Sequence, residues 1–509
     1  MKKPLKLFRK REKIYERGQA MILIAGGFVM LAAFIGLTID AGILFSHMGH
    51  LRRAVDTAAL SAANQFREGQ DLTDIENSAK ELIVLNMPHV DLDTGTTEVE
   101  IFTCASDYTL CPPSGDPPRK LVRVVARTQV DFAFMPIVGI ENYTITADAV
   151  SEAASLDLIL VIDTSPSMSY DAFCGDGDDD DGDGVADDGC ASGPGQVGPN
   201  PDDFYRDQEE CVLAGECHPF EEVRQAAIDL MDNVYFPYDR VALVTFDQVA
   251  ALQLDLTYCS QTFYGDSDAQ KQCVIDELDD MEIIPDPDPA TFCTDWASTG
   301  DPRGCMSTNS AGGLLIAGNE FGYNGRDEAV WIVIFLSDGV ANAGNSTSPP
   351  SLPEDWVCPA ATWRTADNPE GPYCNDGVAS TRHTTASADY DADDYARDRA
   401  DFVGCLDADA PVQYCATPGQ GAVVFAVGLG DRMTSYSVSH HVPALDPDLG
   451  EQLLRYIANV GFDGDPANDP CDSVASGLSC GNYFYAATGA DVAPIFEAIA
   501  SRIFTRLTH

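Results

Sequence analysis

Three oxygen-bearing side chains stand at the end of the apolar stretch LDLILVID, which begins at Leu156, and just after it. They are Asp163, Ser165 and Ser167, in the order Asp-Thr-Ser-Pro-Ser. Alternate positions on a turning loop can converge on one point, and a carboxylate with two hydroxyls offers the hard oxygen donors that suit Mg²⁺, Mn²⁺ or Ca²⁺. The same residue types also cap helices. The spacing therefore predicts either a divalent metal site or a helix cap.

A second oxygen-rich stretch, CGDGDDDDGDGVADDGC, runs from Cys174 to Cys190. Part of it follows the start of an EF-hand calcium loop, with glycine at position 6, where the loop turns sharply. The ligands in that pattern are the Asp179, Asp181, Asp183 and Asp187 carboxylates and the Val185 carbonyl. Position 12 is Cys190 instead of glutamate, so the pattern matches a shortened loop similar to the aspartate-rich calcium repeats of thrombospondins. A solvated acidic turn is the alternative, but aspartates at this density repel one another, which favours Ca²⁺.

The length and charge of the chain limit its class. A chain of 509 residues is too long for one compact core, so two or more domains are expected. The net charge is −51, although residues 1–18 carry eight Lys or Arg against two Glu. A body this acidic will not bind nucleic acid through its phosphates.

An uncharged apolar segment, Gln19 to Ile39, follows the basic residues 1–18. About 20 residues at about 1.5 Å each are enough to cross a hydrocarbon core of about 30 Å. A cleaved signal peptide would have a shorter apolar core, so a retained anchor is favoured. The positive-inside rule then places 1–18 in the cytoplasm, a transmembrane helix over 19–43 and the bulk of this single-pass protein outside, in the periplasm or at the cell surface.

All 16 cysteines lie beyond the apolar segment. An even number on the oxidising side indicates disulfides, and the absence of any CxxC weakens a zinc interpretation. Pairing of sequence neighbours is the simplest arrangement. It gives the couples Cys104 and Cys111, Cys174 and Cys190, Cys211 and Cys217, Cys259 and Cys273, Cys293 and Cys305, Cys358 and Cys374, Cys405 and Cys415, and Cys471 and Cys480.

Residues 44–154 are expected to form a helix followed by a small β region. The helix keeps apolar residues at three- and four-residue steps, which predicts either packing against a partner helix or a continuous stalk. These residues are Leu44, Met48, Leu51, Val55, Ala59 and Ala62. Alternating, β-branched stretches over 97–104, 120–139 and 143–153 then predict a small sheet.

From residue 155 to 509, buried-strand patterns alternate with helical ones. This alternation predicts an α/β domain with a doubly wound, mostly parallel sheet. After LDLILVID the expected elements are 220–235, 240–246, 269–281, 329–338, 393–404, 421–430, 449–460, 482–487 and 491–507. Cysteine-rich insertions at about 170–218, 257–306 and 341–391 are expected to surround the edge that bears Asp163.

The order of three motifs resembles the von Willebrand factor type A (VWA) family. Its metal-ion-dependent adhesion site (MIDAS) uses DxSxS, a later threonine and a later aspartate. Thr308 in STNSAGGL and Asp338 in IVIFLSDGVAN stand in the matching places, although Ser310 replaces a second threonine that is common there. The resemblance covers about 156–509. It implies that these residues and the DTSPS motif hold Mg²⁺, Mn²⁺ or Ca²⁺, and that the metal accepts a carboxylate from a protein partner.

The N-terminal part resembles TadG-like proteins of Tad (Flp) pilus assembly. Those proteins have a membrane helix, an aspartate and an alanine-rich stretch, matched here by HLRRAVDTAALSAA with Asp56 in the acidic place. They often carry a C-terminal VWA domain. The resemblance implies a membrane-anchored accessory of pilus assembly or secretion.

Two other functions are compatible with the sequence. A calcium-stabilised surface adhesin or matrix-binding protein would use the same metal site without any part in pilus assembly. A structural stalk protein would leave the site empty. An enzyme is not expected, because the sequence has no HExxH, P-loop, GxSxG or dinucleotide-binding glycine pattern.

Overall fold

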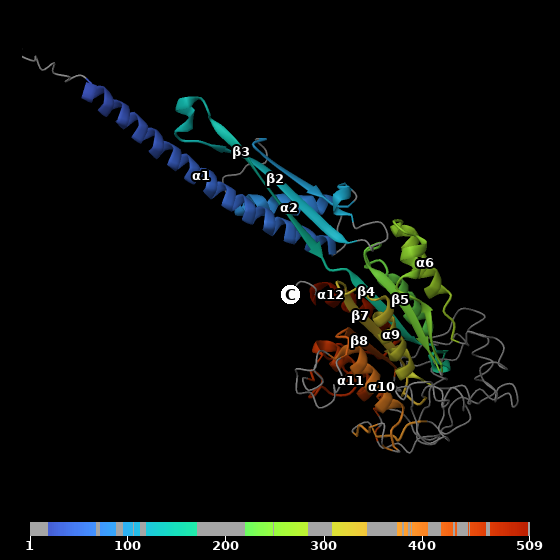
Figure 1. Ribbon diagram of the computed structural model, residues 1–509. Coiled ribbons are helices and arrows are strands. Elements are labelled where there is room, and N and C mark those ends of the chain that lie inside the picture. Colours follow the sequence, from blue (N-terminus) through green and yellow to red (C-terminus); the bar gives the residue numbers. More distant parts are fainter. Residues whose placement is uncertain are drawn as a thin grey trace, which may run out of the picture. The chain divides into compact units, whose positions relative to one another are not determined.

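The computed structural model describes most of the chain outside the long insertions. The described residues are 19–67, 72–87, 95–104, 106–111, 119–169, 219–247, 249–283, 308–343, 374–378, 381–384, 387, 389–405, 419–430, 433–434, 446, 448–464 and 469–506. They form two compact units (Figure 1). The first takes in Met1–Phe66, Gln70–Gly115 and Lys120–Ala153, and the second takes in most of the rest, from Ala154 onward.

The first unit combines two helices with a three-stranded antiparallel sheet. Its elements are α1 (Gln19–Arg67), α2 (Leu72–Asn86), β1 (Thr97–Phe102), β2 (Lys120–Asp131) and β3 (Asn142–Ala153), and the sheet order is β1-β2-β3. The strand-like pattern over 120–139 does not continue as one strand. β2 ends at Asp131, and a 3₁₀ turn with Pro136 near its start and Gly139 at its end (φ 88°) reverses the chain into β3.

Helix α1 has two different halves. The apolar side chains from Met21 to Ile39 are exposed, and the helix is long and apolar enough to cross a membrane. The C-terminal half instead buries a stripe of small and apolar side chains. These are Leu51, Ala54, Val55, Ala58, Ala59, Ala62 and Ala63. The predicted helical repeat is therefore a packing face within the unit, where α2 and the sheet lie beside α1 (Figure 1).

The second unit is built on a six-stranded sheet of order β6-β5-β4-β7-β8-β9. Its strands are β4 (Leu156–Asp163), β5 (Arg240–Phe246), β6 (Ala250–Leu254), β7 (Val330–Ser337), β8 (Val423–Leu429) and β9 (Tyr483–Ala486). All pairs are parallel except β5 with β6, at one edge. In chain order this is 3-2-1-4-5-6, the arrangement of a doubly wound sheet.

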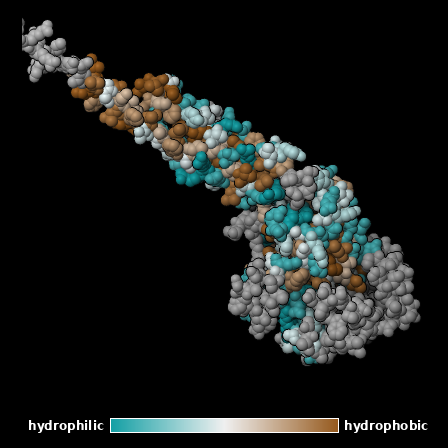
Figure 2. All heavy atoms as spheres, in the orientation of Figure 1, coloured by the Kyte–Doolittle hydropathy of each residue, from teal (hydrophilic) through white to brown (hydrophobic). Residues whose placement is uncertain are grey.

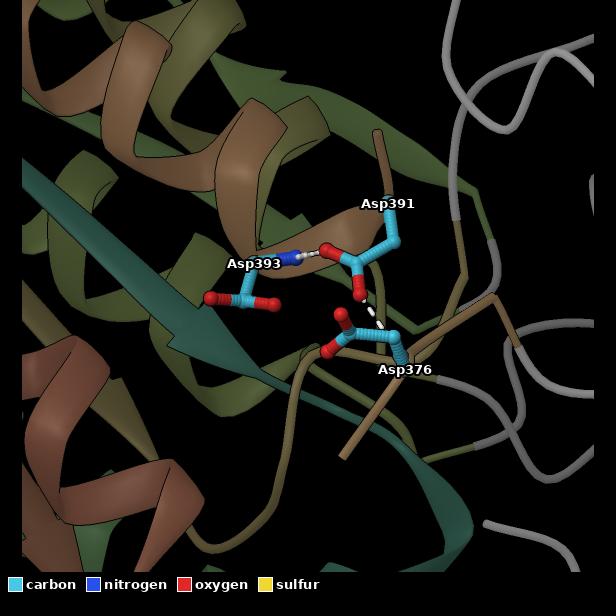
Figure 3. Close-up of side chains that lie close together, drawn as sticks. All are labelled: Asp376, Asp391 and Asp393. Carbon is cyan, nitrogen blue, oxygen red and sulfur yellow. Dashed lines mark hydrogen bonds between the residues drawn. The ribbon is translucent and has the colours of Figure 1, made fainter. Parts of the chain in front are cut away.

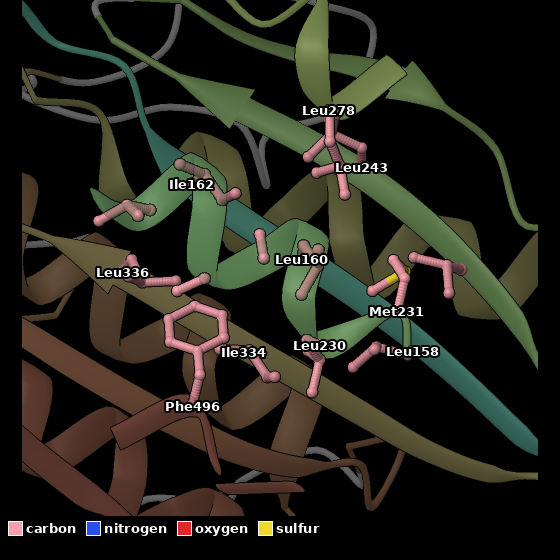
Figure 4. Packing of buried hydrophobic residues seen from close by; sticks show 14 of the residues in the cluster. Leu158, Leu160, Ile162, Leu230, Met231, Leu243, Leu278, Ile334, Leu336 and Phe496 are labelled. Atoms are coloured by element: carbon pink, nitrogen blue, oxygen red, sulfur yellow. The ribbon is translucent and has the colours of Figure 1, made fainter. Parts of the chain in front are cut away.

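Helices cover both faces of this sheet. Successive β4 side chains point to opposite faces: Leu158, Leu160 and Ile162 pack with α4 (Phe220–Leu230), α6 (Ser267–Asp279) and α12 (Val492–Arg506) (Figure 4). Ile159 and Val161 pack with α9 (Ser310–Asn324), α10 (Ala392–Gly404) and α11 (Leu449–Asp463). This confirms the predicted fold class, a doubly wound, mostly parallel α/β sheet preceded by an apolar helix and a small α+β region.

Among the described residues, three disulfides join sequence neighbours, Cys104 to Cys111, Cys259 to Cys273 and Cys471 to Cys480. Cys374 and Cys405 are also disulfide-bonded, and their expected partners lie outside the described residues. The other expected couples also lie outside them, and so does the acidic stretch 179–187.

Candidate metal site

The Asp163 motif lies at the carboxyl edge of the large sheet. β4 ends at Asp163 because the apolar run stops there, and its parallel neighbour β7 ends at Ser337. The register pairs Ile162 with Leu336, so Asp163 comes level with Ser337, and Asp338 follows directly. Ligands of doubly wound sheets bind beyond this edge, which is where the sequence predicted the metal.

Hydrogen bonds join the residues of the predicted site. The Ser165 N–H donates to Oδ1 of Asp163 over 2.9 Å, and the Ser165 and Ser167 hydroxyl oxygens are 3.0 Å apart. The Ser167 hydroxyl donates to Oδ1 of Asp338 over 2.9 Å. Two segments that are 171 residues apart in sequence are thereby brought together.

Thr308, two residues before the start of α9, comes to the same place. Its N–H donates to Oδ1 of Asn342 over 2.8 Å, and its carbonyl accepts from the Asn342 N–H over 3.1 Å. Gly339 directly follows Asp338. A Cβ atom placed on Gly339 would lie 3.5 Å from the Thr308 hydroxyl oxygen, so Thr308 is close to Asp338. The structure therefore gathers all five predicted residues, Asp163, Ser165, Ser167, Thr308 and Asp338, at one edge.

Sequence reasoning missed Ser337 as part of this site. Its hydroxyl donates to Oδ2 of Asp163 over 2.6 Å, so both oxygens of that carboxylate are held in place. Ser337 directly precedes the predicted Asp338, but its orientation follows from the strand register, which the sequence does not state.

The electrostatics of the site favour a cation. The Asp163 and Asp338 side chains have no exposed surface. Burial, with Asp338 beside it, raises the pKa of Asp163 to about 8, against the lowering effect of hydrogen bonds from Ser337 and Ser165. Two buried carboxylates side by side repel each other, and a divalent cation between them would remove both the repulsion and the burial cost. The donor set of two carboxylates and three hydroxyls thus fits a hard divalent metal.

A second acidic cluster, also missed from the sequence, lies at the start of α10. Asp376, Asp391 and Asp393 each place an oxygen within 4.8 Å of the others (Figure 3). Asp391 caps the helix by accepting from the Asp393 and Asp394 N–H groups, and its other oxygen accepts from the Asp376 N–H over 2.6 Å. Burial, followed by the charge of Asp393, raises the pKa of Asp391 to about 10.

This cluster has a protein cation of its own, because Arg397 pairs with Asp393 over 2.9 Å. It is tied to the loop after Asp338: the Cys374 N–H donates to the Asn342 carbonyl, and the Asn375 amide donates to the Ala341 carbonyl. The only sequence signal was the run of alternating aspartates in ADYDADDYARD.

The fold and the site together define a doubly wound α/β domain with a clustered carboxylate and hydroxyl site at the carboxyl edge of its sheet. No protein-family model matches the chain, and no curated protein matches it either.

Several solved structures are similar to the chain at low identity. Proximal thread matrix protein 1 from the mussel byssus, in a form with a zinc-occupied MIDAS motif, is 11% identical with a TM-score of 0.30, over 68% of this chain and 48% of that one. The pilus adhesin SpaC from Lactobacillus rhamnosus GG is 13% identical with a TM-score of 0.35, over 81% and 35%. The vWF domain of the type V pili tip protein Mfa5 from Porphyromonas gingivalis is 15% identical with a TM-score of 0.31, over 70% and 97%.

This chain spans less than half the length of the first two of these proteins. Similarity at such TM-scores does not indicate a function. The strand order of the six-stranded sheet itself defines the doubly wound fold.

Proposed function

We propose that this chain is an extracytoplasmic VWA-type protein that binds a protein partner through a divalent metal. Asp163, Ser165, Ser167, Thr308 and Asp338 would hold the metal, directly or through water. The observation that carries this proposal is their convergence: residues from three separate segments meet at one sheet edge, around two buried carboxylates that repel each other.

The chemistry of the donors suggests what the partner supplies. When bound, the metal would act as a Lewis acid toward an anionic oxygen. Three of its five protein donors are neutral hydroxyls, which leave more positive charge on the metal than carboxylates would. The Asp163 carboxylate is fixed by Ser165 and Ser337, so the donors are oriented in advance. A partner carboxylate is therefore the expected ligand. Mg²⁺, Mn²⁺ and Ca²⁺ all fit this set, and calcium at the 179–187 loop remains a prediction.

We further propose that α1 anchors the protein in a membrane and that the chain is an accessory of Tad (Flp) pilus assembly or secretion. The exposed apolar half of α1 supports the anchor. The HLRRAVDTAALSAA stretch, whose small and apolar residues supply the packing face of the other half, supports the pilus assignment. A surface adhesin unrelated to pili would share the metal site. The identity of the bound partner therefore distinguishes pilus assembly from adhesion.

A pull-down from solubilised membranes tests the metal-dependent binding. Wild type with Mg²⁺ should retain a partner that is lost with EDTA and lost in Asp163→Ala. Asp229→Ala, which removes an exposed carboxylate on α4, is the matched control and should bind as wild type does. An identical partner set in all conditions would contradict the proposal. Pilus secretion components among the retained proteins favour assembly, whereas matrix or host proteins retained in cells without pili favour adhesion.

A further inference from the structure

The hairpin tip between β2 and β3 is an exposed apolar surface. It has the sequence FAFMPIVGI, from Phe132 to Ile140, and contains no charged residue. Ile137 is 84% exposed and Val138 is 71% exposed, and Figure 2 shows the hydrophobic side chains gathered there. Exposed acidic residues, Asp131 and Glu141, stand at both ends of the tip. A soluble surface rarely leaves so many large apolar side chains together in water.

The tip is fastened to α1 where its apolar segment ends. The buried Asp40 carboxylate accepts hydrogen bonds from three successive N–H groups of the tip, at 2.7 Å from Ala133, 3.1 Å from Phe134 and 2.7 Å from Met135. Phe134 also packs against α1 so closely that a Cβ on Gly36 would stand 3.0 Å from its side chain. The apolar surface of the tip is therefore continuous with the exposed apolar surface of α1 (Figure 2).

The length of α1 places this junction at a membrane boundary. The rise from Gln19 to Asp40 is about 32 Å at about 1.5 Å per residue, close to the hydrocarbon thickness of about 30 Å. Gly36 lies about 6 Å nearer to the middle of that segment than Asp40, by the same rise per residue. Phe134, packed on Gly36, thus reaches the depth of the apolar segment itself.

The backbone of the tip is also prepared for an apolar medium, where an unsatisfied N–H is costly. Besides the three groups bound by Asp40, the Phe132 N–H donates to the Glu141 carbonyl and the Ile137 N–H to the Phe134 carbonyl. The N–H groups of Gly139 and Ile140 donate to the Pro136 and Met135 carbonyls. Such bonds also form in turns that face water, but here they lower the cost of moving the tip into an apolar medium.

We propose that the β2–β3 tip inserts into the outer interface of the bilayer that α1 crosses, as a second membrane contact. The occupant of the apolar surface is lipid, at the boundary between headgroups and acyl chains. This inference rests on the proposed anchoring by α1. A second contact beside the helix restricts the rotation and tilt of α1 and so fixes the height of the first unit above the membrane.

Depth-dependent fluorescence quenching in the full-length protein tests this inference. The variants Ile137→Cys, Phe28→Cys and Tyr108→Cys each receive one environment-sensitive label and are reconstituted into phosphatidylcholine vesicles with or without nitroxide lipids. Phe28 lies in the apolar half of α1. Tyr108 is 87% exposed and lies beyond the end of β1, at the other end of the sheet from the tip. Val138→Cys replaces Ile137→Cys if that variant does not fold.

The labels at residues 137 and 28 should be quenched by nitroxide lipids and severalfold less by aqueous iodide than the label at residue 108. A label at residue 137 that iodide quenches as strongly as the one at 108, with 28 protected, overturns the tip insertion alone. A label at 137 that is shielded from iodide but not quenched by nitroxide lipid also overturns it, because a protein surface then covers the tip. Exposure of the label at residue 28 overturns the anchor and the tip proposal together.

Discussion

Replacing Asp163 with asparagine should change stability in opposite directions with and without metal. In metal-free protein the two buried carboxylates, Asp163 and Asp338, have no cation between them. Burial and then Asp338 raise the pKa of Asp163 from 3.8 to about 8, so at pH 7 this side chain is mostly protonated in the folded chain, and taking up that proton is a penalty on folding. It amounts to about 4 kcal/mol at pH 7, because each pH unit between 3.8 and 7 adds about 1.4 kcal/mol.

Asparagine avoids this penalty but keeps only one oxygen to accept from Ser165 and Ser337. The lost hydrogen bond and the burial of the amide reduce the gain by about 1 to 3 kcal/mol. Asp163→Asn should therefore be more stable than wild type in EDTA, by about 1 to 3 kcal/mol. In Mg²⁺ at about 100 times the dissociation constant, wild type should gain about 2.7 kcal/mol, and the variant should gain nothing.

Urea unfolding at pH 7, followed by circular dichroism in EDTA and in Mg²⁺, measures both effects. Asp239→Asn is the matched control, because it alters a buried carboxylate in the same unit that accepts from the N–H groups of Leu156 and Tyr235. It should lower stability in EDTA and keep the full gain from metal. If Asp163→Asn is less stable than wild type in EDTA, or keeps the gain from Mg²⁺, the reasoning about the two carboxylates is wrong.

Substitutions at three further positions test other parts of the second unit. Burial, with Asp393 next to it, raises the pKa of Asp394 to about 6, so the folded chain keeps a proton that the unfolded chain has lost. The unfolding free energy should then fall as the pH rises from about 4 to about 6. Asp394→Asn should make that fall less steep in paired urea titrations, because the raised pKa values of Asp163 and Asp391 also contribute to it. Gly461→Ala would press a methyl group into the Val424 backbone. It should cost at least about 3 kcal/mol in urea unfolding, and a loss below about 1 kcal/mol would contradict the packing. Asp157→Ala leaves two buried arginines without their shared carboxylate and should cost about 3 to 5 kcal/mol, with Asp157→Asn losing less.

The sequence predicted those strands and helices that have a clear pattern of apolar residues within their own segment. LDLILVID and RVALVTF became β4 and β5 because both faces of a central parallel strand are buried, which leaves an uninterrupted apolar run. Other elements were missed, among them β6 and α9. β6 is a five-residue antiparallel edge strand with mostly exposed side chains, so it carries no clear alternation. The sequence of α9 contains several glycines, which normally disfavour helix.

The glycines of α9 show why packing decided its structure. A Cβ on Gly313 would stand 2.8 Å from a Val161 methyl and 2.9 Å from the Phe246 ring. The helix therefore approaches the sheet more closely than any larger residue allows, and burial outweighs the weak helical propensity. The close approach follows from the surfaces of β4 and β5 that pack against α9, and these strands lie more than 60 residues away in the sequence.

The two acidic clusters also differ in whether a local sequence pattern marks them. In the first cluster, Asp163, Ser165 and Ser167 could be predicted because they follow a recognisable strand, whose end lies at the ligand-binding edge of a doubly wound sheet. Asp338 also ends a recognisable strand, but it and Thr308 were placed by the resemblance of their motifs to the VWA family. The second cluster joins Asp376 to Asp391 and Asp393 through the course of a loop, and no strand end marks that loop in the sequence.

The charge of the chain sets a condition on the proposed partner. One divalent metal would be balanced by Asp163 and Asp338, so the loaded site is close to neutral, while the chain as a whole carries −51. A partner carboxylate that approaches this site is repelled by the net negative charge of the chain at distances within about 10 Å in moderate salt. Basic groups around that carboxylate would reverse the repulsion and speed the encounter. A partner with an isolated acidic patch is therefore disfavoured, and a carboxylate set among lysines and arginines is the surface that both the metal and the acidic chain would attract.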